Sequence, residues 1–140
     1  MPDPITIDAH VPVAPERAWD AFTDAKAITQ WNVASPDWCS PWAEVDLRVG
    51  GRHIARMEAK DGSVGFDFDG TYEEVERLTA VTLRLADGRL SRTTFTADGG
   101  GTRVRTVFEP DASHPADMQR TGWQAILDTY AAFVSKQEAP

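Results

Sequence analysis

The sequence predicts an α+β fold in which an antiparallel sheet of seven strands wraps around one long C-terminal helix. Three Asp-Gly pairs, at 61–62, 87–88 and 98–99, separate runs that alternate apolar and polar residues, which is the strongest local signal for a β-hairpin. After Pro115 the apolar residues recur every three or four positions, as on a helix. With 140 residues, of which 41% are hydrophobic, residues 1–140 are expected to form one domain with its core at about 5–134.

The N-terminal part is predicted to hold one strand and two short helices. Residues 5–11 alternate with a period of two and form the first strand. Pro15 suits the first position of a helix, because its missing N–H would be unpaired there anyway. Asp24 can cap a second short helix over about 25–31. The segment 32–42, with two prolines and two tryptophans, is expected to be irregular.

Six further strands follow before the last helix. Each shows period-two alternation, and the turns between several of them carry glycine. The expected strands are 43–49, 52–57, 66–73, 81–85, 90–96 and 102–108.

The sheet and the long helix are expected to leave a space between them. A strongly twisted sheet cannot press evenly along a straight helix. Aromatic side chains point into this space from both sides, and the tryptophans of the irregular segment are placed to roof one end. Apolar walls with a few polar tips are typical of small-molecule sites. The predicted ligand-binding residues are Trp31, Trp38, Trp42, His53, Met57, Phe66, Phe68, Tyr72, Trp123, Leu127 and Tyr130.

Charge and hydropathy argue against nucleic-acid and membrane partners. The net charge is −8 and the pI is about 4.7, without a local basic patch, so phosphate backbones and anionic lipids are repelled. No apolar run approaches the roughly 20 residues of a spanning helix. The N-terminus lacks the features of a signal peptide, so a cytoplasmic location is expected. The single cysteine, Cys39, leaves no internal disulfide and no cysteine-based zinc site.

His53 is the one candidate for a catalytic role. It lies on the inward face, where it could donate a hydrogen bond to a ligand or act as a general acid or base. The simpler interpretation is a histidine at the core edge, bonded to a backbone carbonyl or water. The sequence contains no nucleophile elbow, phosphate loop or dinucleotide fingerprint, so no cofactor is predicted.

No metal site is predicted either. Asp67 and Asp69 form an Asp-x-Asp pattern, but their alternation with aromatic residues places them on the outer face. There they are expected to pair with Arg56, Arg84 or Arg92. The three histidines lie on unrelated elements without ligand spacing.

Five short motifs together resemble the START-like, helix-grip superfamily, whose fold is that of the birch-pollen-allergen type. More narrowly, the chain is similar to the SRPBCC-type family named after activators of a heat-shock chaperone ATPase, often described as polyketide cyclase-like. The resemblance covers about residues 5–134 and implies a cavity gripped by the last helix. The motifs are residues 15–19 (PERAW), 30–31 (QW), 46–52 (DLRVGGR), 70–75 (GTYEEV) and 122–123 (GW).

Three functions are compatible with these observations. The leading hypothesis is the binding of a small hydrophobic or aromatic molecule in the cavity, without catalysis. The resemblance also permits a cyclase or dehydratase, in which His53 or a tyrosine moves a proton. By likeness to the chaperone-ATPase activators, a third possibility is a protein-binding module or a homodimer that uses an apolar surface around Trp38 and Trp42.

Overall fold

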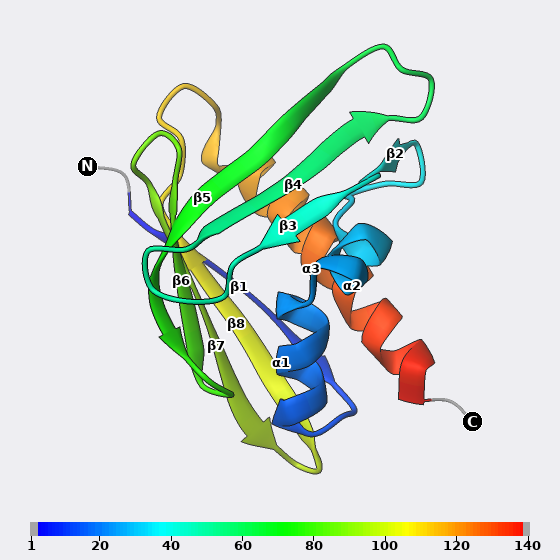
Figure 1. The fold of residues 1–140 in the computed structure, drawn as a ribbon, viewed down its shortest axis with the longest axis vertical. Helices are drawn as coiled ribbons and strands as arrows, with labels where there is room; N and C mark the ends of the chain where they lie inside the picture. Colours follow the sequence, from blue (N-terminus) through cyan, green and yellow to red (C-terminus); the bar gives the residue numbers. More distant parts are fainter. Residues whose placement is uncertain (1–2, 139–140) are drawn as a thin grey trace.

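The computed structural model describes residues 3–138 (Figure 1). Its elements are β1 (Ile5–Val11), α1 (Pro15–Thr23), α2 (Ala25–Trp31), β2 (Trp38–Cys39), β3 (Ala43–Val45), β4 (Arg52–Ala59), β5 (Gly65–Glu76), β6 (Ala80–Leu85), β7 (Leu90–Asp98), β8 (Gly101–Phe108) and α3 (Ala116–Glu138). The predicted first strand and second helix have the expected bounds, and Asp24 caps α2 by accepting a hydrogen bond from the backbone N–H of Ala27.

The sheet is antiparallel throughout and runs in the order β1-β8-β7-β6-β5-β4-β2, with β3 also paired to β4. It curls around α3, and α1 and α2 lie beside that helix (Figure 1). The predicted α+β, helix-grip architecture is therefore confirmed. Among residues 3–138, no helix is long and apolar enough to cross a membrane.

The sheet has eight strands rather than the predicted seven, because the segment before β4 folds differently. The predicted strand 43–49 ends at Val45, since the chain then turns back on itself through hydrogen bonds such as that from Gly51 N–H to the Arg48 carbonyl (2.8 Å). Leu47 and Val49 alternate in sequence but are exposed. The extra strand, β2, lies in the segment expected to be irregular and has only two residues, too few to show a period.

The turn at Gly50 and Gly51 holds the middle of β5. Gly50 N–H donates to the Tyr72 carbonyl (2.8 Å), and Tyr72 N–H donates to the Gly51 carbonyl (2.9 Å). Gly50 has a φ of +85°, which favours glycine. A Cβ atom on Gly51 would collide with the backbone carbonyl oxygen of Asp46. The backbone of Tyr72, a residue of the candidate site, therefore depends on this turn.

The substitution Gly51→Ala is expected to destabilise the fold by about 1–3 kcal/mol, the usual cost of overpacking a tight site. Urea unfolding followed by circular dichroism measures this free energy. Gly122→Ala is the matched control, because a Cβ atom there meets no heavy atom within 4 Å and alanine favours a helix. Equal unfolding free energies for Gly51→Ala and the unmodified protein would contradict the role assigned to the turn.

The outer face of the sheet carries ion pairs between neighbouring strands. Asp67 pairs with Arg56, as predicted, but Asp69 pairs with Arg52, because the β4–β5 register sets Arg52 opposite Thr71 and so diagonal to Asp69. The other two predicted arginines pair with glutamates further along β5. The pairs are Arg56–Asp67 (3.3 Å), Arg52–Asp69 (2.7 Å), Arg92–Glu74 (2.9 Å) and Arg84–Glu73.

Candidate functional site

A cavity of about 310 Å³ lies between the concave face of the sheet and α3. This volume is at the small end of the range of ligand pockets. Phe66 lines the cavity and is 48% exposed, so the cavity reaches solvent beside this ring. The lining residues are Ile7, Phe22, Thr23, Ile28, Trp31, Asn32, His53, Met57, Phe66, Phe68, Tyr72, Val81, Leu83, Arg89, Ser91, Thr93, Thr106, Trp123, Ile126 and Leu127.

Most of the predicted site residues lie in this wall. They come from β4, β5, α2 and α3, which approach one another only in the folded chain. The lining residues of β4 and of β5 are separated by even numbers of positions along each strand, so each set lies on one face of the sheet. The predicted residues that line the cavity are Trp31, His53, Met57, Phe66, Phe68, Tyr72, Trp123 and Leu127.

Three predicted site residues lie outside the wall. Trp38 contacts the rim instead, with its ring edge-to-face against Phe66 at 6.1 Å between centroids. Trp42 is 43% exposed and does not roof the cavity. Tyr130 is buried, and its hydroxyl donates to the Ala18 carbonyl (2.6 Å) in α1, so its polar tip turns away from the cavity.

Trp123 is held in the wall by other aromatic rings. Its indole stacks on Phe108 with 3.9 Å between centroids and 9° between planes, and forms a T-shaped pair with Phe68 at 6.0 Å between centroids. Trp31 closes the α2 side of the cavity, and its indole N–H donates to the Ala21 carbonyl (2.9 Å). The N–H of Trp31 therefore serves the fold, and its apolar ring faces the cavity.

His53 and Tyr72 form a buried polar pair in the wall. His53 Nδ1 and the Tyr72 hydroxyl are 3.1 Å apart. Burial lowers the pKa of His53 from 6.5 to about 4 and raises the pKa of the Tyr72 hydroxyl above its usual value. Both groups are therefore neutral at pH 7. Because efficient general acids and bases have a pKa near the working pH, this pair is better suited to hydrogen bonding than to proton transfer.

Several polar lining residues were missed by the sequence analysis. On β7, Ser91 and Thr93 share the inward face with Phe95, and on β8 Thr106 lies opposite Thr93. The hydroxyls of Thr93 and Thr106 are 2.7 Å apart and satisfy each other. Ser91 and Thr93 precede the buried Phe95 by even numbers of residues. Strand alternation counted from Phe95 could therefore have revealed that both side chains point inward. The remaining polar lining residues that were missed are Thr23, Asn32 and Arg89.

Comparison with protein-family models gives one match over most of the chain. Residues 12–135 match the family described as "Activator of Hsp90 ATPase homolog 1-like protein". This match confirms the resemblance seen in the sequence motifs. A search of curated proteins finds no match.

Solved structures with the same fold include two that are also similar in sequence. A protein of Aeromonas hydrophila described as AHSA1-like is 42% identical, with a TM-score of 0.91 over 96% of this chain and 93% of that one. Chr148 of Cytophaga hutchinsonii is 36% identical, with a TM-score of 0.82 over 96% and 93% of the two chains. Protein NE0264 of Nitrosomonas europaea is only 16% identical, yet has a TM-score of 0.84 over 97% and 96%, which shows a shared fold.

Proposed function

We propose that this chain, which belongs to the family of Activator of Hsp90 ATPase homolog 1-like proteins, binds a small hydrophobic or aromatic molecule between its sheet and α3. The observation that carries the proposal is the cavity of about 310 Å³, whose wall is largely aromatic and aliphatic. Burying apolar ligand surface there would contribute about 25 cal/mol per Å² before the costs of association are subtracted.

Binding is favoured over catalysis by the state of the polar groups in the wall. Burial lowers the pKa of His53 to about 4, so its side chain is neutral at pH 7 and is a poor general acid. The same low pKa makes it a weak base. A cyclase could still act by positioning its substrate. That alternative remains a prediction.

The third possibility, a protein-interaction module or homodimer, depends on exposed apolar side chains. Trp42 is exposed and Trp38 is partly exposed. Exposed tryptophan supports this alternative without identifying a partner, so it also remains a prediction.

The proposed function is tested by filling the cavity. Leu83 lines it from β6, and Leu83→Trp places a larger ring in the free volume. Among aromatic compounds of one to three rings titrated by calorimetry, those that bind the unmodified protein are expected to bind this variant at least about tenfold more weakly, a loss of about 1.4 kcal/mol.

Leu47→Trp is the matched control, because Leu47 is exposed and does not line the cavity. This variant is expected to bind the same compounds as the unmodified protein does. Two results would count against the proposal: a panel in which no compound binds the unmodified protein, or affinities that Leu83→Trp leaves unchanged.

A further inference from the structure

Arg89 is the one residue with a permanent charge in the cavity wall formed by residues 3–138. The protein as a whole has a net charge of −8, whereas this wall carries one positive charge and is otherwise uncharged. We propose that the ligand is an apolar molecule with a carboxylate group, and that the guanidinium of Arg89 binds this carboxylate. This inference rests on the proposed function and narrows it to one class of ligand.

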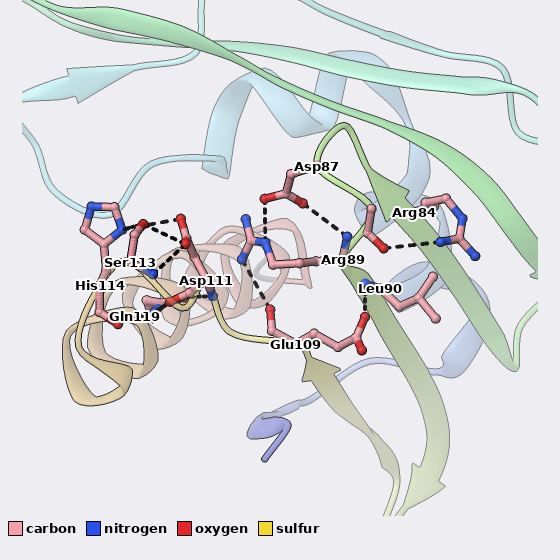
Figure 2. Close-up of polar contacts among 10 residues, drawn as sticks. Arg84, Asp87, Arg89, Leu90, Glu109, Asp111, Ser113, His114 and Gln119 are labelled. Carbon is pink, nitrogen blue, oxygen red and sulfur yellow. Dashed lines mark hydrogen bonds and ion pairs between the residues drawn. The ribbon is translucent and has the colours of Figure 1, made fainter. Parts of the chain in front are cut away.

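Arg89 lies in the turn between β6 and β7. Its side chain is held by this turn and by the segment that joins β8 to α3. Its Nε donates to Asp87 Oδ2 (2.7 Å), and its Nη1 donates to the Glu109 carbonyl (3.2 Å; Figure 2). The side chain is only 25% exposed. Two of its nitrogens are thus held by the protein, and a guanidinium held in this way loses little freedom when it binds a ligand.

Nη2 of Arg89 has no hydrogen-bond partner within the part of the chain that the structure describes. Because Arg89 lines the cavity and the protein does not engage this nitrogen, its two N–H groups can donate to a ligand. A carboxylate is the acceptor that suits a guanidinium best, because the hydrogen bond is charge-assisted and both groups are planar.

Ser91 provides a second, independent donor on the same face. Arg89 immediately precedes β7, Ser91 is the second residue of that strand, and both residues line the cavity. Ser91 is only 8% exposed, and its hydroxyl has no partner among the described residues. Among the described residues no buried side-chain polar atom lacks a partner, so this hydroxyl is an accessible atom of the cavity wall and can donate a hydrogen bond to a ligand oxygen.

The acidic groups near Arg89 are directed elsewhere. The Asp87 side chain is half-exposed, so water screens its pair with Arg89. Glu109 Oε1 accepts from Leu90 N–H (2.6 Å). Asp111 accepts from Ser113, whose hydrogen bonds lower the pKa of Asp111 to about 2 (Figure 2). None of these carboxylates lines the cavity.

The inference is tested with two probes that differ only at the polar group: 2-naphthoic acid and 2-naphthalenemethanol. In calorimetric titrations at pH 7.5 and low salt, the acid is expected to bind the unmodified protein at least about tenfold more tightly than the alcohol. Arg89→Met is expected to abolish this preference by weakening only the acid. Arg89→Lys is expected to retain part of it, because lysine keeps the charge but not the planar group.

Arg84→Met is the matched control. Arg84 contacts the same turn through the Gly88 carbonyl (3.2 Å), but it lies outside the cavity wall, so its loss should leave the preference intact. Equal binding of acid and alcohol by the unmodified protein would overturn the role of Arg89 while leaving hydrophobic binding in place. Binding of neither probe nor any neutral aromatic compound would instead contradict the proposed function. The comparison of probes on the unmodified protein holds even where Arg89→Met fails to fold.

Discussion

Lowering the pH from about 6.5 to about 4 is expected to remove about 3 kcal/mol of folding free energy through His53 alone. In the unfolded chain His53 takes up a proton near pH 6.5, whereas in the buried site it does so only near pH 4. Between these values the unfolded state binds more protons, so stability falls as the pH falls. Above this window the full stability is present, and below it His53 causes no further loss.

Urea unfolding at pH 7, 5.5 and 4 measures this effect. The variant His53→Gln cannot be protonated and can still hydrogen-bond to Tyr72, so its stability is expected to fall much less over the window. Carboxylates with a lowered pKa, such as Glu74 and Asp111, also destabilise the fold at low pH, but both proteins share them and their effect cancels in the difference. Parallel curves for His53→Gln and the unmodified protein would show that His53 is not held neutral by burial.

Local sequence signals predicted most of the sheet because strand pairing follows from alternation and turn chemistry. Each of the three Asp-Gly pairs lies where one strand ends and the chain turns into the next. Alternation wrongly predicted a strand through Leu47 and Val49, where the chain leaves the sheet to form the turn before β4. Apolar alternation marks a strand only where a partner strand continues alongside it, and the partner is not visible in the local pattern.

The candidate site was predicted less completely, because polar side chains line its buried wall, where apolar side chains are usually expected. Inward positions are expected to be apolar, so a histidine at such a position was recognised as a candidate site residue. The small hydroxyl side chains of Ser91 and Thr93 were not. Arg89 was missed because it lies in a turn, whose orientation depends on its contact with Glu109, 20 residues along the chain. Tyr130 was misplaced for a related reason, since a helix stripe does not reveal which part of it another helix covers.

Tyr130→Ala is expected to destabilise the protein by about 3–5 kcal/mol, which is the usual cost of removing a large buried aromatic ring. Tyr130 is fully buried. Its ring contacts Phe22 of α1 and Trp31 of α2 edge-on, at 5.4 and 5.2 Å between centroids. The substitution would therefore leave a hole where all three helices meet. Against a total stability of about 5–15 kcal/mol, it is expected to lower the midpoint of urea unfolding sharply.

Tyr130→Phe separates the ring from the hydroxyl. It removes only the hydrogen bond to the Ala18 carbonyl, so a loss of about 0.5–1.5 kcal/mol is expected. Because that hydroxyl is directed toward α1, the variant should bind cavity ligands as tightly as the unmodified protein does. If Tyr130→Phe instead weakened ligand binding and left the unfolding free energy unchanged, the hydroxyl would have to face the ligand. In that case Tyr130 would belong to the cavity wall, as its place on the apolar stripe of the last helix first suggested.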